Sequence, residues 1–240
     1  MHFAGGAIPA DYMGYVRKKH LWILGGVLLL FLLLIVSISV GAAGVPPYDV
    51  FLSLVNGSVD RITAFLHPGL PLPEVSSTDR IVWNIRLPQA LAAIVAGVGL
   101  SVAGVAMQSI LRNPLGSPFT LGISNAGAFG AAVSVILLGT GEMHSTVADA
   151  VTLNNPYLTT IVAFIFCLLA TGVILAISRV RGASPEVMVL AGVAISSLFT
   201  AGTMFLQYFA DDTQLAAVVF WTFGDVSRAS WQELGIMTLV

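Results

Sequence analysis

The sequence predicts an all-α protein: a polytopic membrane helix bundle with five complete transmembrane helices and the start of a sixth. Hydrophobic residues make up 57% of the 240 residues and charged residues only 9%, whereas a soluble domain carries about 25% charged residues. Five long stretches are free of charge, and a helix needs about 20 apolar residues to cross a bilayer core. The predicted spans are 21–43, 88–111, 118–139, 156–178 and 187–209, with a sixth helix beginning near residue 232.

The first span follows three consecutive basic residues, Arg17, Lys18 and Lys19. A basic start before an apolar stretch is also typical of a signal peptide, and Gly41–Ala43 has the composition of a cleavage site. The apolar stretch is longer than the 7–15 residues that are usual for the hydrophobic region of a signal peptide. We therefore expect an uncleaved helix.

The basic residues orient the spans, because cytoplasmic loops carry an excess of lysine and arginine. With a cytoplasmic N-terminus, six of the ten basic residues fall inside, including Arg112, Arg179 and Arg181. This predicts that the N-terminus lies in the cytoplasm and that the helices alternate in direction.

The long loop between the first two spans, 44–86, contains apolar residues at helical spacing over 51–66. We expect an amphipathic helix in the membrane interface, packed against the outer ends of the spans. The run His67–Pro73, with three prolines and a glycine, is expected to end any helix.

The second span is unusually rich in small residues. Its glycines and alanines form pairs four residues apart, which let helix backbones approach closely in a bilayer. One interpretation is an ordinary tightly packed helix, and the other is a central helix beside a translocation path. The residues expected at the packing surface or path, here and at the start of the third span, are Gly97, Gly99, Gly104, Gln108, Gly122 and Gly127.

A tight turn with the sequence Arg-Asn-Pro-Leu-Gly-Ser-Pro follows the second span. Pro114 disfavours helix at Asn113, and Pro118 suits the first turn of a new helix behind Ser117 as N-cap. The sequence therefore predicts a cytoplasmic turn motif built on Asn113, Pro114, Leu115 and Pro118.

Several kinds of chemistry are not expected of this chain. Neither lysine is preceded by the glycine of a phosphate-binding loop, and the four histidines fall on both predicted sides. The spans hold no acid or base for a proton relay, and a net charge of −2 offers no nucleic-acid footprint. We expect no catalytic, cofactor-binding or metal-binding residues.

Several motifs together resemble the FecCD-type family, the membrane permeases of binding-protein-dependent ABC importers for iron-siderophores, haem and cobalamin. The resemblance covers nearly the whole chain. It is carried by Arg86-Leu87-Pro88, Gln108, the turn Asn113–Pro118, Leu121-Gly122-Ile123-Ser124, Leu190–Ala194 and Phe220–Gly224.

The resemblance implies a type II ABC importer permease of roughly ten helices, of which residues 1–240 would be the N-terminal part of one transmembrane domain. It implies a homodimer in the bilayer of a prokaryotic inner membrane, an extracytoplasmic substrate-binding protein, and two ATP-binding subunits that bind ATP and Mg²⁺. Arg86 would meet acidic residues of the binding protein.

The sequence departs from the family pattern at three positions. Gln89 stands where the family often has a second arginine, Gly116 where it commonly has alanine, and Asp225 where it commonly has serine. The stretch from Gln207 to Ala216 is closest to the iron-complex branch. The alternative interpretation is a secondary transporter, or a membrane enzyme or scaffold whose functional half lies outside this sequence.

Overall fold

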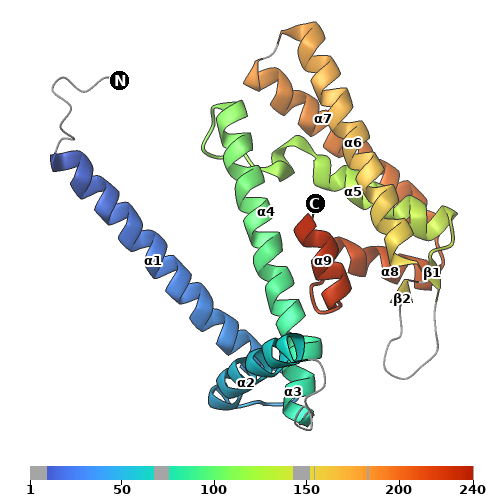
Figure 1. Ribbon diagram of the computed structural model, residues 1–240. Helices are drawn as coiled ribbons and strands as arrows, with labels where there is room; N and C mark the ends of the chain where they lie inside the picture. Colours follow the sequence, from blue (N-terminus) through green and yellow to red (C-terminus); the bar gives the residue numbers. More distant parts are fainter. Residues whose placement is uncertain (1–9, 68–75, 143–151, 154, 183, 240) are drawn as a thin grey trace. The chain divides into compact units, whose positions relative to one another are not determined.

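The computed structural model describes residues 10–67, 76–142, 152–153, 155–182 and 184–239, and most of these are helical (Figure 1). The chain divides into two compact units. Residues 1–95 and 226–240 form the first unit, and residues 96–225 form the second.

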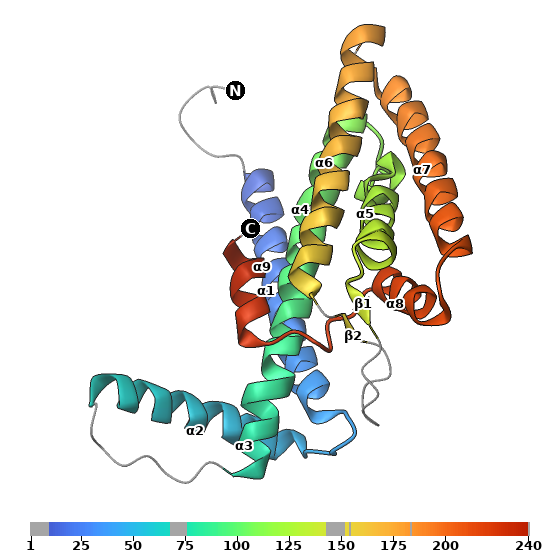
Figure 2. The same ribbon diagram turned by 90° about the vertical axis from the view of Figure 1, so that its right-hand side faces the viewer.

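The first unit consists of helices from both ends of the described chain. Its elements are α1 (Ala10–Ser39), α2 (Pro47–Leu66), α3 (Ser77–Ile81), the π-helix η1 (Val82–Arg86), the beginning of α4 (Leu87–Leu111), and α9 (Trp231–Leu239). Pro47 occupies the first turn of α2, where its missing N–H costs nothing. Figure 2 shows α2 lying across the direction of α1 and α3.

The helix that carries the second predicted span begins at Ser77 rather than at residue 88, because α3, η1 and α4 run on without a break to Leu111. Pro88 lies inside this helix, where a proline normally clashes with the preceding turn. The preceding turn is a π-helix, with the Leu87 N–H bonded to the Val82 carbonyl. A wider turn of this kind accommodates Pro88 without ending the helix.

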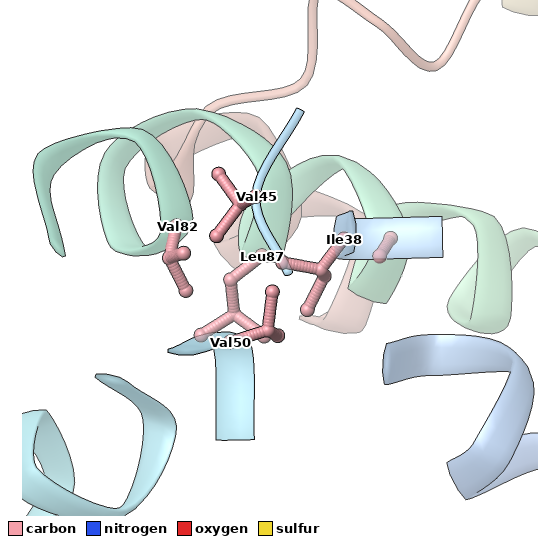
Figure 3. Close-up of a cluster of buried hydrophobic side chains, with 6 residues drawn as sticks. Ile38, Val45, Val50, Val82 and Leu87 are labelled. Carbon is pink, nitrogen blue, oxygen red and sulfur yellow. The ribbon is translucent and has the colours of Figure 1, made fainter. Parts of the chain in front are cut away.

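A small hydrophobic core joins α1, α2 and the helix that begins at Ser77. Ile38 from α1, Val50 from α2 and Val82 from η1 are each 0% exposed. Val45, Leu87 and Ala90 complete the cluster (Figure 3). The end of α1, the start of α2 and the helix from Ser77 are therefore fixed to one another at this junction.

In the second unit α5 lies beside α6 and α7 (Figures 1 and 2), and α8 also contacts it. The elements of this unit are the rest of α4, the 3₁₀ turn η2 (Pro118–Leu121), α5 (Ile123–Ala132), the π-helix η3 (Val133–Leu137), α6 (Pro156–Arg181), α7 (Pro185–Tyr208) and α8 (Asp212–Phe223). Two short strands, β1 (Gly141–Glu142) and β2 (Thr152–Leu153), pair antiparallel. Phe129, Phe166 and Phe199 meet between the helices, with ring centroids 5.1–6.2 Å apart.

Four helices of the described residues are long and apolar enough to cross a membrane: Tyr12–Ser39, Ser77–Leu111, Pro156–Arg181 and Pro185–Tyr208. The third predicted span, 118–139, is instead a shorter apolar helix, Ile123–Leu137. Pro118 starts a separate 3₁₀ turn, and Gly122 has a left-handed φ of 69°. Both features detach the first turn from the helix that follows.

One further difference and one agreement concern the last third of the chain. Helix α8 was not predicted, although Asp211 caps it by accepting a hydrogen bond from the Gln214 N–H at 2.8 Å. Helix α9 begins at Trp231, next to the predicted position 232.

Candidate functional site

The guanidinium of Arg86, the predicted docking residue, is bound to the end of α1. Its Nη1 donates to the carbonyl oxygens of Ile38 at 2.6 Å and Ser39 at 3.1 Å, and its Nη2 donates to the Ala43 carbonyl. The last carbonyls of a helix lack partners within the helix, and a cation there also complements the helix dipole. Arg86 is therefore the C-terminal cap of α1.

Gly41 makes room for this cap. A Cβ at Gly41 would lie 2.7 Å from Arg86 Nη2 and 3.0 Å from its Cζ. This arrangement could not be predicted from the sequence, because the carbonyls that Arg86 binds belong to a segment 43–48 residues away. The docking role remains a prediction for a side chain that is half-buried and already hydrogen-bonded.

Gln89, where the family commonly has a second arginine, also makes an internal contact. Its side-chain amide donates to the Ser227 carbonyl. Nearby, the Trp231 indole N–H donates to the Trp83 carbonyl at 2.8 Å. These two bonds attach the segment before α9 and the start of α9 to the beginning of the helix Ser77–Leu111.

The turn after α4 is organised by Asn113. Its side-chain oxygen accepts the Leu115 N–H at 2.9 Å, and its carbonyl accepts the Gly116 N–H at 3.0 Å. Pro118 then occupies the first turn of η2, as predicted from its position after Ser117. Leu115 is 82% exposed at the tip of the turn, so an apolar side chain is presented outward.

Gly116, one of the departures from the family pattern, lies in a confined position. It is buried, and a Cβ there would lie 3.1 Å from the Asn113 carbonyl oxygen and 3.2 Å from Leu111 Cδ1. An alanine at this position requires a shift of a few tenths of an ångström in the turn.

The glycines expected at the packing surface fall into two groups. A Cβ at Gly97, Gly99 or Gly104 of α4 would meet no atom within 4 Å among the described residues. At Gly122 a Cβ would lie 2.8 Å from the Gly192 carbonyl, and at Gly127 it would lie 3.1 Å from Cys167 Sγ. The second group marks close helix contacts. In the first group, Gly97 and Gly104 lie on one side of α4 and Gly99 on another, and all three positions are open.

Gln108, the remaining predicted path residue, is exposed near the end of α4. Its carbonyl accepts the Asn113 N–H at 3.2 Å, which places it directly before the turn.

The second unit contains two clusters of hydrogen-bonded polar side chains that were not predicted from the sequence. The Asn125 amide of α5 donates to Ser196 Oγ and, at 3.3 Å, to Thr200 Oγ1 on α7. The buried hydroxyls of Ser134, Thr140 and Thr159 lie 3.0–3.3 Å from one another. Ser196 and Thr200 are one helical turn apart, and this spacing is the only sign of either cluster in the sequence.

Acidic, cysteine and histidine side chains do not gather within the described part of the chain. No three or more of them come close enough there to hold a metal ion.

Residues 28–240 match the model of the FecCD transport family. The chain is 48% identical over 233 residues to a protein of Methanocaldococcus jannaschii that is named as an ABC transporter permease, an alignment covering 97% of this chain and 62% of that protein. It is 34% identical over 160 residues to the iron chelatin transport system permease protein of Helicobacter pylori, covering 67% of this chain and 44% of that protein.

The vitamin B12 import system permease protein of Klebsiella pneumoniae is 28% identical over 221 residues, covering 92% of this chain and 56% of that protein. The fold is similar to a solved metal-chelate type ABC transporter in an inward-facing conformation. That likeness has a TM-score of 0.63 and 24% identity, and it covers 88% of this chain and 55% of the solved chain. The chain thus spans about half the length of these relatives.

Proposed function

This chain belongs to the FecCD transport family, and from that premise we propose that it forms part of the membrane permease subunit of an ABC importer. The observation that carries the proposal is the family match over residues 28–240 together with the permease names of its relatives. The four long apolar helices and the family make the chain an integral membrane protein. Its contribution to transport would be a path and docking surfaces rather than bond chemistry.

The proposed substrate is an iron chelate such as a siderophore or haem complex, or a cobalamin-like molecule. Relatives named for iron chelatin and for vitamin B12 support this substrate class. Uncharged hydrogen-bonding groups within the apolar helices, such as Asn125 and Thr200, suit a path for a large chelate better than an ion-coupling site.

The proposed partners are a second copy of the permease, two ATP-binding subunits and an extracytoplasmic substrate-binding protein. ATP and Mg²⁺ would be bound by the ATP-binding subunits. The absence of a phosphate-binding loop motif from the sequence supports this division of labour.

The proposed location is a prokaryotic inner membrane with a cytoplasmic N-terminus. Single cysteines at Leu115 in the turn and at Asn56 on α2 test the orientation in a Cys167→Ser background. We expect an impermeant maleimide to label Asn56→Cys in intact cells, and Leu115→Cys only after permeabilisation. Labelling of both in intact cells would contradict the orientation.

Reconstitution of the full-length complex tests the function itself. The permease is purified with its ATP-binding subunits and binding protein, retained ligand is identified by mass spectrometry, and uptake is measured in proteoliposomes. We expect uptake that requires both ATP and the binding protein, for iron(III) chelates, haem or cobalamin. Uptake driven by an ion gradient without ATP would instead favour a secondary transporter, and turnover of a bound molecule without uptake would favour a membrane enzyme.

A further inference from the structure

Helix α2 packs with Val50, Ser53 and Leu54 and leaves most of its large apolar side chains exposed. Val50 is 0% exposed and Ser53 is 5% exposed on the packed side. At 100° per residue, the opposite side carries large apolar side chains that are 37–62% exposed. They are Phe51, Leu52, Val55, Val59, Ile62 and Leu66. A surface helix of a soluble domain buries its large apolar residues, so this arrangement is reversed.

Contacts on the packed side fix the rotation of α2. The Trp83 indole N–H donates to the Ser53 carbonyl at 3.0 Å, and Ser53 Oγ donates to Asp79 Oδ1 at 2.5 Å. The indole lies so close to Gly57 that a Cβ there would be 2.7 Å from Trp83 Cε2. The helix cannot turn its large apolar side inward without breaking these contacts.

The helix on which α2 packs extends beyond the hydrocarbon core. Its 35 residues, Ser77–Leu111, rise about 52 Å, compared with about 30 Å for the core. Asp79, Arg80 and Arg86 all lie in its first ten residues, so this end is the one outside the core. Helix α2 contacts Asp79 and Trp83 at this end and lies across the direction of α1 and α3 (Figure 2). This is the orientation of a helix that lies along a membrane surface.

Interface-type side chains flank the exposed apolar side. The Arg61 guanidinium carbon lies 3.7 Å from the ring centroid of Trp83, and Tyr48 is 69% exposed at the start of α2. Tryptophan, tyrosine and arginine are typical of the headgroup layer, where an apolar body and a polar end are both satisfied. Apolar side chains of α1 are also exposed along the span that precedes α2.

We propose that α2 is an interfacial helix whose large apolar side is inserted among phospholipid acyl chains, with Arg61 and Trp83 at headgroup level. The occupant of the exposed face is the lipid of the surrounding bilayer. In this arrangement α2 anchors the ends of α1 and of the helix Ser77–Leu111 at a defined depth, through the junction of Ile38, Val50 and Val82.

Spin labels on the full-length complex in phospholipid nanodiscs test this inference. Single cysteines at Val55 and Ile62 report on the apolar side, and Asn56→Cys is the matched control on the polar side, all in a Cys167→Ser background. We expect collisions with oxygen to exceed collisions with a water-soluble nickel chelate at Val55 and Ile62, and the reverse at Asn56. Predominant nickel collisions at Val55 and Ile62 would overturn the proposal, as would labels there that neither reagent reaches.

A photo-crosslinker provides an independent measurement if a spin-labelled variant assembles poorly. With p-benzoylphenylalanine at Phe51, we expect a mass increase equal to one phospholipid. A crosslink to a second copy, to another segment of the chain or to the binding protein would identify a protein occupant and overturn the assignment to lipid.

Discussion

Arg86 donates hydrogen bonds to two carbonyls at the end of α1 and to the Ala43 carbonyl in the segment that follows. Removing its guanidinium therefore destabilises the end of α1 as well as the helix that carries Arg86. We predict that Arg86→Gln lowers the stability of the full-length protein by about 1–3 kcal/mol, because charge-assisted hydrogen bonds to partly buried carbonyls are lost. Thermal unfolding in detergent measures the effect. Arg80→Gln, a change at an exposed arginine, is the control, and equal stability of the two variants would refute the capping role.

The docking prediction for Arg86 needs a different readout from the capping role. If Arg86 also attracts the binding protein, Arg86→Gln slows association at low salt, and Arg86→Lys slows it less because its charge remains. A stability loss with an unchanged association rate at low salt would leave capping as the only role.

Arg112 adopts a left-handed conformation, with φ 47°, at the end of α4. This conformation costs an L-residue with a side chain roughly 1–2 kcal/mol relative to glycine. We predict that Arg112→Gly raises the stability of the full-length protein by about 1 kcal/mol, measured by thermal unfolding. Arg112→Ala removes the same charge but keeps the strained φ. Equal gains from both changes would assign the effect to charge instead.

At the level of elements, close helix contact in the second unit depends on Gly122 and Gly192. A Cβ at Gly192 would lie 2.7 Å from Leu121 Cα, and Gly122 combines a φ of 69° with similar crowding. We predict that Gly122→Ala destabilises the full-length protein by about 2–4 kcal/mol, through backbone strain and overlap.

Gly172 of α6 is the matched control for Gly122, because a Cβ there meets nothing within 4 Å in the described structure. Gly172→Ala should leave stability unchanged or raise it by about 0.5–1 kcal/mol, as expected for a helix interior. Both variants are compared by thermal unfolding in the same detergent. A smaller loss for Gly122→Ala than for Gly172→Ala would contradict the close contact.

The sequence predicted the apolar helices better than it predicted their ends or contacts. Long charge-free stretches follow directly from the cost of burying charge in lipid, so α6 and α7 begin and end within three residues of the predicted spans. The first helix differs, because α1 runs over Ala10–Ser39 instead of 21–43 and so includes the basic residues Arg17, Lys18 and Lys19. The start at Ser77 was missed because Pro88 reads as a helix boundary, and only the preceding π turn allows the helix to continue.

In the candidate site too, local features could be predicted from the sequence and long-range contacts could not. The turn at Asn113–Pro118 was predictable, since its geometry is set by adjacent prolines and an N-cap. The contacts of Arg86 and Asn125 were not, because each joins segments more than 40 residues apart. Sequence alone also could not separate Gly122, in close contact with α7, from Gly104, on an open surface.

For the whole molecule, the open side of α4 is the surface that the assembled permease is expected to cover. A Cβ at Gly97 or Gly104, which lie two turns apart on this side, would meet no atom within 4 Å among the described residues. Ser101 lies four residues after Gly97, and small residues four apart are typical of closely packed membrane helices. In the proposed importer, this surface would meet either a second copy or another part of the full-length permease.

We predict that Gly104→Leu reduces the yield of the assembled full-length complex, because the larger side chain separates backbones that must approach closely. Gly104→Ala should be tolerated better, since it adds a single methyl group. Val105→Leu, at a neighbouring side chain that is 65% exposed, is the control for adding bulk beside the open surface. Yield is measured by size-exclusion chromatography of the permease copurified with its ATP-binding subunits. If Gly104→Leu assembles as well as Val105→Leu, this side of α4 faces lipid and the small residues have no packing partner.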